Sequence, residues 1–373
     1  MTTFDRYLLR RFWHVFGIGF FATVGLFVVF DGFTNVDAFQ DRAGGASSLV
    51  VFGRMAQYYS YQTILIFDLV GAFLNVVSTM VVFALLQKNR EIHPILSAGV
   101  PTIRLLVPML VGALTVSGLL MLNQEFVLPA LAGEFLKPIG TSAHDGQPVK
   151  TRRDFSTHIE ISGQELILDE RKLRRCEFLL PAPEMVSEIT RLKAEEAVYR
   201  RRGKRLPAGW HLKQVSPRFA DLRVTSAGQK VILPLADETE LFVATDISCE
   251  QLLGSAAVSR YQSTLELVQG LQNASFSVVA TRTHVLQLHE RLTRPLLNLL
   301  AVCLAVPLVL KKESFSLITN LAVCAVVMVG LLGVEQVGFY LGRMNWLPQD
   351  LAIWLPIIVS GTLTAWFFDR VQT

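Results

Sequence analysis

The segment from Gln87 to Pro108 carries charged and small side chains in a pattern suited to electrostatic binding of a partner protein. Its three leading charges are Lys88, Arg90 and Glu91. A short helix-compatible patch follows and stops at Gly99, because glycine tolerates the turn that ends a helix. A connection between two membrane helices needs only a few residues. A longer loop with its own short helix, at about residues 88–100, therefore predicts a surface that a partner holds.

Motifs for phosphate binding, zinc-dependent hydrolysis and serine-nucleophile chemistry do not occur in the sequence. There is no G-x-x-x-x-G-K-[ST] loop, no H-E-x-x-H pair and no G-x-S-x-G turn. The histidines at positions 144, 158, 211, 284 and 289 lack the spacing of a metal-ligand set. We therefore predict a chain that is not an enzyme, holds no metal or cofactor and has no nucleic-acid partner.

The composition indicates a membrane protein that carries a polar domain. Of the 373 residues, 51% are hydrophobic and only 18% are charged, which is too apolar for an ordinary soluble enzyme. Of the four cysteines, Cys303 and Cys324 fall in apolar runs, where a cysteine acts as a small buried hydrophobe. Cys176 and Cys249 fall in the polar middle, where two free thiols and, with less support, a disulfide both fit.

Six apolar runs have the length and composition of membrane-spanning helices, three before the polar middle and three after it. The expected spans are Phe12–Phe30, Gln62–Leu86, Leu105–Leu128, Pro295–Leu310, Ser316–Tyr340 and Leu351–Phe368. Residues 31–60 are expected to form a short external excursion. Asp68 falls near the outer end of the second run, and Glu335 falls inside the fifth. An acid at such a position faces the bundle interior or a wet cavity, or it lies at the outer interface.

Residues 130–282 are charged, interrupted by proline and glycine, and contain no long apolar run. Several short pieces alternate between apolar and polar residues, as half-buried strands do. The clearest begin at His158, Glu165, Leu222, Val231 and Glu240. They predict a β-sandwich or jelly roll. Residues 184–202 show a helical pattern instead and lead into a basic run at 200–205, which fits a solvated face or contact with anionic head groups.

The basic residues of the short loops fix an orientation. With the N-terminus inside, the inner segments hold nine basic residues: Arg6, Arg10, Arg11, Lys88, Arg90, Arg104, Lys311, Lys312 and Arg370. The short outer loops hold three: Arg42, Arg54 and Arg343. This bias follows the positive-inside rule and predicts cytoplasmic termini, a cytoplasmic loop at 88–100 and an external β-domain.

Five sequence pieces, taken in order, resemble the LptF/LptG permease family of lipopolysaccharide export. Glu91-Ile followed by Ser97-Ala-Gly is similar to the family's cytoplasmic loop. The other four are Asn123–Pro129 (NQEFVLP), Gly209–Leu212 (GWHL), His289–Pro295 (HERLTRP) and Leu347–Pro356 (LPQDLAIWLP). Their order and spacing cover nearly the whole chain. We expect an α-helical membrane protein with six transmembrane helices, three plus three, and an inserted periplasmic jelly-roll-like domain. The expected boundaries are 1–129, 130–282 and 283–373.

The resemblance implies one permease subunit of an ABC exporter in the inner membrane. A second LptF/LptG-type permease and a cytoplasmic ABC ATPase homodimer complete such an exporter. It lifts lipopolysaccharide or a related lipid from the outer leaflet and passes it to a periplasmic jellyroll bridge protein. The resemblance assigns the ATPase-coupling contact to Glu91, Ile92, Leu96, Ala98 and Gly99.

The sequence departs from the family pattern in three places. Residues 62–86 lack the prolines usual in the second helix, and residues 184–202 have no obvious counterpart. Asp31 and Asp37 stand where the family has basic residues near the outer end of the first helix. Arg42 and Arg54 are the expected substitutes for meeting lipid phosphates, and Glu335 is a third candidate for lipid contact.

Two other classes of protein compete with a transporter as interpretations of this sequence. A scaffold would use the helices only to anchor a β-module in the envelope, but such an anchor has no need of a cytoplasmic coupling helix. A mechanotransmitting ABC subunit usually has four helices with its large external domain after the first. Here the domain follows the third, which favours the exporter.

The charge bias makes the topology testable by labelling single cysteines in sealed cells. A membrane-impermeant maleimide should label positions near Ser47 and Gln229 but not Asn89 or Glu313, because the inner loops hold most of the Lys and Arg residues. All four positions should react after permeabilisation, which is the control. External labelling of Asn89 in sealed cells would reverse the orientation.

Overall fold

The computed structural model forms two compact units, and each is described by itself. The helical unit comprises residues 1–129 and 285–373, and the β unit comprises residues 130–284. The described residues are 3–42, 48–97, 99, 102–135, 146–168, 170–201, 207–235, 239–253, 260–271, 278–310 and 317–369.

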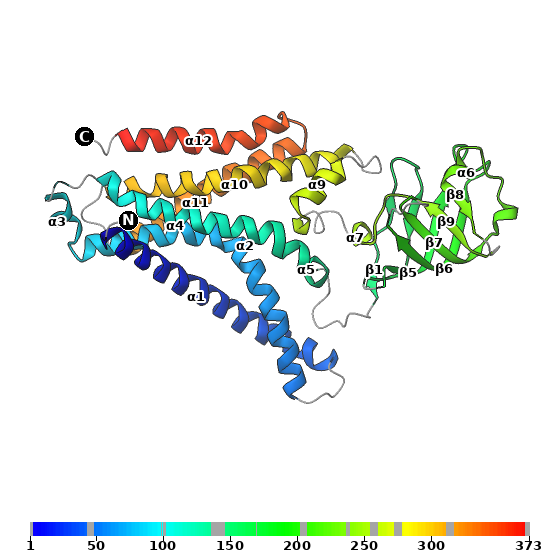
Figure 1. The fold of residues 1–373 in the computed structure, drawn as a ribbon, viewed down its shortest axis with the longest axis horizontal. Helices are drawn as coiled ribbons and strands as arrows, with labels where there is room; N and C mark the ends of the chain where they lie inside the picture. Colours follow the sequence, from blue (N-terminus) through cyan, green and yellow to red (C-terminus); the bar gives the residue numbers. More distant parts are fainter. Residues whose placement is uncertain are drawn as a thin grey trace. The chain divides into compact units, whose positions relative to one another are not determined.

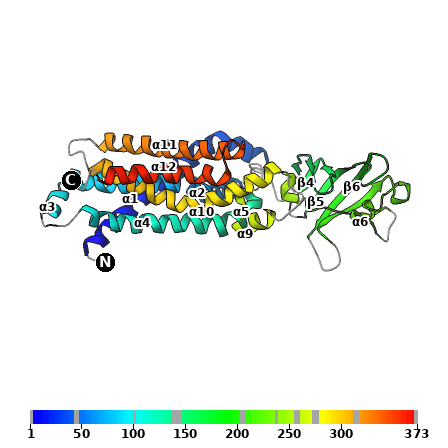
Figure 2. The same ribbon diagram turned by 90° about the horizontal axis from the view of Figure 1, so that it is seen from above.

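Long helices form the helical unit (Figures 1 and 2). They are α1 (Thr3–Arg42), α2 (Ser48–Lys88), α4 (Thr102–Leu122), α10 (Val278–Leu310), α11 (Leu317–Arg343) and α12 (Gln349–Asp369), with the short α3 (Ile92–Ser97) between α2 and α4. A π-helical turn, η1 (Asn123–Val127), continues α4 into α5 (Leu128–Phe135). Five helices in the described part of the chain are long and apolar enough to cross a membrane. They are Thr3–Asp37, Leu49–Lys88, Arg104–Phe135, Ala325–Arg343 and Gln349–Phe367. The expected span Pro295–Leu310 lies in α10, which is not among these five.

Residues 31–42 and 48–60, in the stretch predicted to form a short external excursion, are helical. α1 continues to Arg42 and α2 already begins at Ser48. The two helices pair along this stretch: Tyr59 Oη donates to Asp31 Oδ2 at 3.1 Å, and the Phe39 and Tyr58 rings lie 5.5 Å apart. Polar and aromatic side chains thus find hydrogen-bond and packing partners between two antiparallel helices. These partners stabilise the polar stretch as helix.

One apolar core joins the first and second halves of the helical unit. It includes Phe12 of α1, Met80 and Phe83 of α2, Met109 of α4 and Val302 of α10, all with at most 1% of their surface exposed. The helices before the β unit in sequence therefore pack directly on a helix that follows it. Burying side chains of this size contributes roughly 1.5–3 kcal/mol each when water is the reference.

α11 and α12 approach closely near the turn between them. A Cβ on Gly338 would collide with the carbonyl oxygen of Ala352, and one on Gly342 would lie 2.8 Å from the Cβ of Ala352. Glycines four residues apart let two membrane helices approach backbone to backbone.

The start of α1, the end of α12 and α3 lie at one end of the helical unit, and α4 runs from that end to the other (Figures 1 and 2).

The β unit is built on one nine-stranded antiparallel sheet with strand order β1-β4-β5-β6-β7-β9-β8, in which β3 also pairs with β2 and β5. The strands are β1 (Gln147–Pro148), β2 (Arg152–Arg153), β3 (Glu160–Ser162), β4 (Glu165–Ile167), β5 (Lys172–Leu180), β6 (Thr190–Arg200), β7 (Gly209–Ser216), β8 (Ile232–Pro234) and β9 (Leu241–Ala244). Its helical segments are η2 (Phe219–Asp221), α6 (Gly228–Val231), α7 (Cys249–Leu252) and α9 (Thr264–Leu271). Four of the five predicted strands are found as β3, β4, β8 and β9. The piece beginning at Leu222 forms only a single bridge, from Val224 to Val186.

The helical prediction for residues 184–202 is wrong, because residues 190–200 form β6, an 11-residue strand in the middle of the sheet. Its buried residues are Leu192, Ala194 and Ala197, so burial does not strictly alternate. The neighbouring strands are irregular at the same level, since Arg175 and Gln214 have φ values of 45° and 54°. This irregularity shifts the buried face by one residue and hides the two-residue period in the sequence.

Trp210 is the centre of the β-unit core. It is fully buried, its ring packs 5.4 Å from that of Tyr199, and its Nε1 donates to the Ile247 carbonyl at 3.0 Å. Cys176 and Cys249 are buried in the same core and are not joined by a disulfide. Burial raises the pKa of the Cys176 thiol to about 12, so it is protonated at neutral pH.

The β unit has its own core, so we expect residues 130–284 to fold when expressed alone. Far-UV circular dichroism should show mainly β structure and one cooperative melt. Trp210→Ala should lower the free energy of unfolding by roughly 3–5 kcal/mol, because it leaves a cavity and an unpaired Ile247 carbonyl.

The control is Arg174→Ala. That side chain is 52% exposed and lies 3.8 Å from Glu165, so its loss should change stability by less than about 1 kcal/mol. A mainly helical spectrum, or equal losses in the two variants, would contradict the predicted core.

Candidate functional site

The turn between α2 and α4 adopts the predicted short helix. Asn89 and Glu91 donate their backbone N–H groups to the carbonyls of Leu85 and Leu86, both at 2.9 Å, and close the end of α2. Arg90 has a φ of 56°, which reverses the chain before α3 begins at Ile92. α3 is six residues long, and Gly99 beyond it has a φ of 76°, a conformation that favours glycine.

The five predicted coupling residues are described to different extents. Glu91 is half-buried, Ile92 is buried with 7% of its surface exposed, and Gly99 is exposed. Leu96 belongs to α3, but its side chain lies outside the described part of the structure, as does the whole of Ala98. Ile92 therefore fixes the segment on the helical core, and Glu91 lies at its rim.

Glu91 binds α1 as well as its own turn. Arg11 donates from Nη1 to Oε2 at 3.3 Å and from Nη2 to Oε1 at 3.2 Å, and Tyr7 Oη donates to Oε2 at 2.9 Å. Asn89 Nδ2 donates to Oε1 at 3.1 Å. The side chains of Arg11 and Glu91 are 28% and 29% exposed, so this ion pair is partly shielded from water.

The first turns of α1 place these donors. Tyr7 and Arg11 are four residues apart and therefore share one helix face, and the Arg11 guanidinium lies 4.5 Å from the centre of the Tyr7 ring. Leu8 and Phe12, one residue further on, are fully buried in the core that contains Ile92. The same stretch of helix thus supplies an apolar contact and a polar one to the segment.

The surroundings of Glu91 keep it ionised. Desolvation by itself would raise the pKa of this carboxyl, but hydrogen bonds from Asn89 and Tyr7 and the charge of Arg11 hold the pKa below its usual value of 4.5. Folding thus gains stability from the carboxylate above that pH, and the gain is lost as the pH falls through the lowered pKa.

A second group of charges lies inside the helical unit. Arg294 Nη1 is 3.4 Å from Asp68 Oδ1, and its Nη2 donates to the Asp68 carbonyl at 3.4 Å. The Asp68 side chain is 4% exposed and that of Arg294 is 25% exposed. Asp68 lies 20 residues before Lys88, which at about 1.5 Å per residue is about 30 Å along α2 and near the far end of a membrane crossing.

Four more ionisable residues interact with this pair or with one another: Glu125, Glu290, Arg291 and Glu335. Glu125, Glu290 and Asp68 attract Arg291, while Glu290 and Arg294 act on Glu335. Glu290 and Glu335 line one small cavity with Thr293, which has room for about one water. Glu335 is half-buried and faces this cavity, and its depth in the membrane stays a prediction.

The two arginines predicted to meet lipid phosphates are described to different extents. Arg54 is exposed in the second turn of α2, and it is 14 residues, or about 21 Å, from Asp68 along that helix. Arg42 is the last residue of α1, and its side chain lies outside the described residues. The structure thus does not bring Arg54 together with Glu335 in one lipid-contact site.

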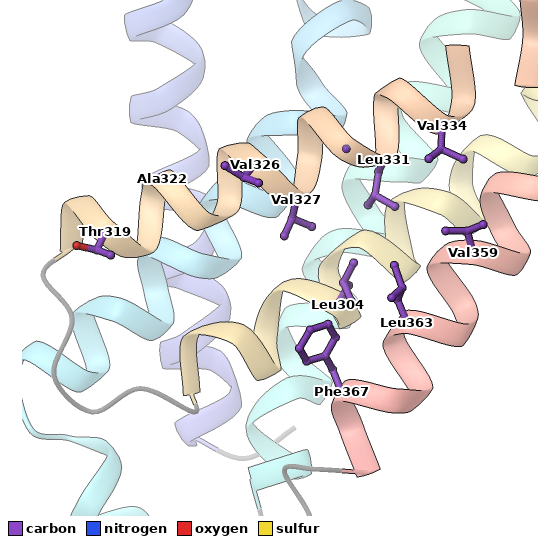
Figure 3. A pocket seen from close by; sticks show the side chains of 11 residues that line it. Leu304, Thr319, Ala322, Val326, Val327, Leu331, Val334, Val359, Leu363 and Phe367 are labelled. Atoms are coloured by element: carbon purple, nitrogen blue, oxygen red, sulfur yellow. The ribbon is translucent and has the colours of Figure 1, made fainter. Parts of the chain in front are cut away.

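An apolar pocket of about 520 Å³ opens between α10, α11 and α12 (Figure 3). Leu304, Leu363 and Phe367 point into it from α10 and α12, and Val327 and Leu331 line it from α11 (Figure 3). Thr319 is its one polar lining residue among those described. Such a lining suits hydrocarbon and offers nothing to a charged group.

In the part of the chain that the structure describes, no three His, Cys, Asp or Glu side chains come together as a metal site.

The sequence analysis missed Tyr7, Arg11 and Arg294 as members of the two polar sites. The four-residue spacing of Tyr7 and Arg11 beside Leu8 and Phe12 was the one available signal for the first.

A bundle of apolar helices that carries an inserted β unit is the architecture of a multi-pass membrane protein. The family model of the lipopolysaccharide export system permease LptF/LptG matches residues 6–370, and the chain belongs to this family. A search of curated proteins finds no match. The chain is thus a permease subunit of lipopolysaccharide export, a multi-pass inner-membrane protein of a family of non-catalytic transporter subunits.

The buried ion pair yields a stability prediction. Asp68→Ala leaves Arg294 without its carboxylate partner, and we expect the free energy of unfolding in detergent micelles to fall by roughly 3 kcal/mol. This value is the lower end of the range for buried pairs, because Arg294 is a quarter exposed.

The double variant Asp68→Ala/Arg294→Met removes both charges and should recover most of that loss. Asp350→Ala, at a side chain that is 83% exposed, is the matched control and should change stability by less than about 0.5 kcal/mol. A double variant as unstable as Asp68→Ala would show that the two residues do not act as a pair.

Proposed function

We propose that this permease extracts lipopolysaccharide or a related lipid from the outer leaflet of the inner membrane and passes it to a periplasmic bridge protein. A cytoplasmic ABC ATPase homodimer supplies the energy, and a second LptF/LptG-type permease completes the membrane part. The family match over residues 6–370 is the observation that carries this proposal. No further function is favoured by the described residues.

The arrangement of the helices supports cytoplasmic termini. The start of α1, the end of α12 and α3 lie at the same end of the helical unit, so both ends of the chain face the same side as α3 (Figures 1 and 2). The positive-inside bias of the sequence makes that side the cytoplasm. With α10 counted as the sixth crossing, the chain leaves and re-enters the helical unit on the periplasmic side.

We propose the segment of residues 88–100 as the docking site of the ATPase. Ile92 fixes it on the helical core, and Glu91 presents a charge at its rim. Docking would bring Glu91 against a basic group in a groove on the ATPase, with α3 and Gly99 filling the rest of that groove. The absence of any phosphate-binding loop in the sequence agrees with ATP hydrolysis by a separate chain.

The β unit is proposed as the periplasmic jelly-roll-like domain that hands the lipid on. Its strand order ends at β1 and β8, whose outer edges pair with no other strand among the described residues and could accept one from another β domain. Pro148 and Pro234 lie in these two strands, and proline on an edge limits uncontrolled pairing. Arg42 and Arg54 remain the proposed contacts for lipid phosphates, whereas Glu335 is better suited to the interior charge group.

Replacing Glu91 tests the docking proposal. Glu91→Lys should abolish copurification of the ATPase, because a cation then faces a cation and the loss of the pair alone weakens docking by roughly 2–5 kcal/mol. An acidic residue placed at the facing basic position of the ATPase should restore binding and ATP-driven export.

The matched control is Glu195→Lys, the same change of charge at an exposed position of the β unit. It should leave copurification unchanged. Normal assembly and export in the Glu91→Lys variant would contradict the proposed contact.

A further inference from the structure

Glu91 is held in place from within the chain. Its two carboxylate oxygens accept four hydrogen bonds, two from Arg11, one from Tyr7 and one from Asn89. Three of the four bonds come from α1. The Glu91 side chain is still 29% exposed, so the carboxylate can meet a cation of another protein while α1 holds it.

A local role at the start of α3 does not explain this geometry. A carboxylate that only stabilised the positive end of a short helix would need no hydrogen-bond donors from α1. Tyr7 and Arg11 lie 84 and 80 residues before Glu91 in sequence. The bidentate Arg11 contact instead fixes the carboxylate in one orientation, because both ends of the guanidinium fork are engaged.

The contacts of Glu91 with α1 link the docking segment directly to the first membrane span. Along the chain, the segment reaches α1 only through the 41 residues of α2, about 60 Å of helix. The contacts of Tyr7 and Arg11 with Glu91, together with the buried Leu8 and Phe12 beside Ile92, join the two directly. The start of α1 is therefore in direct contact with the segment.

We propose that Tyr7 and Arg11 are positioning residues that latch the ATPase-docking segment to α1 through Glu91. The latch delivers the movement of the docked ATPase to the first membrane span. This inference rests on the proposed function, because it takes residues 88–100 as the docking site.

The opposite arrangement, in which the ATPase displaces Arg11 and takes over Glu91, predicts an effect of opposite sign. Arg11 would then compete with the ATPase, and its removal would tighten docking. A latch predicts instead that removal of Arg11 leaves docking nearly unchanged but disconnects it from α1. The sign of the effect on association thus separates the two arrangements.

The experiment uses the complete exporter in proteoliposomes, with lipopolysaccharide as the transported probe. Arg11→Gln should leave ATPase copurification within about twofold of the unmodified complex. The amount of lipopolysaccharide released per ATP hydrolysed should fall at least about tenfold, because hydrogen bonds to a charged group are lost. Tyr7→Phe should give a smaller loss, and Arg11→Lys, which keeps the charge without the fork, should recover part of it. Arg10→Gln changes an exposed neighbour and is the matched control.

A second readout needs no ATPase. Amide hydrogen exchange across residues 88–99 of the purified permease should rise at least about tenfold in Arg11→Gln and stay unchanged in Arg10→Gln. In the unmodified chain, protection should persist as the pH falls to 4.5 and disappear below it, because Arg11, Tyr7 and Asn89 keep the pKa of Glu91 under its usual value. In Arg11→Gln, protection should already be lost at higher pH.

The outcomes are distinguishable. Unchanged exchange and unchanged release per ATP in Arg11→Gln would overturn the latch, and so would tighter ATPase association. If Glu91→Lys leaves ATPase association intact, the docking proposal fails instead. The exchange measurement still decides the latch in that case, since it is made on the permease alone.

Discussion

The ion pair between Asp68 and Arg294 holds together parts of the chain that are 226 residues apart in sequence. Asp68 belongs to the helices before the β unit, and Arg294 belongs to those after it. An unpaired ion in an apolar interior costs several kcal/mol, so each side chain restricts where the other can lie. The shared apolar core of α1, α2, α4 and α10 then closes around this fixed point. A helical unit interrupted by a whole domain thereby becomes one body.

The parts of the fold that could be predicted are those set by local composition. Apolar runs of membrane length must be helical, because a bilayer offers no water to an unpaired backbone group. The sequence failed where partners come from elsewhere. The polar residues after Phe30 gave no sign that Asp31 would meet Tyr59, so the helical extension was missed. β6 was misread because irregular backbone at Arg175 and Gln214 disturbs the alternation that identifies a strand.

At the candidate site, too, some residues could be predicted from the sequence and others could not. Glu91 stands out in sequence because an acid at the start of a short helix between two apolar runs is unusual. Tyr7 and Arg11 do not, since a basic residue ahead of the first span is common on the inner side of membrane proteins. Their importance comes from a contact with Glu91 that only the packed bundle creates. Arg294 is a similar case, because its partner lies across the inserted domain.

The glycines of α11 give the last two helices a mechanical asymmetry. At Gly338 the backbone of α11 lies directly against the Ala352 carbonyl, and at Gly342 it lies against the Ala352 Cβ, so the α11–α12 pair is tightly joined near its turn. Further along, the same two helices and α10 surround the apolar pocket of about 520 Å³. The two helices are therefore held together near Ala352 and are easier to separate at their far ends. Hydrocarbon entering the pocket would move those far ends apart while the contact at Ala352 stayed in place, so the displacement of each helix would increase with distance from Ala352.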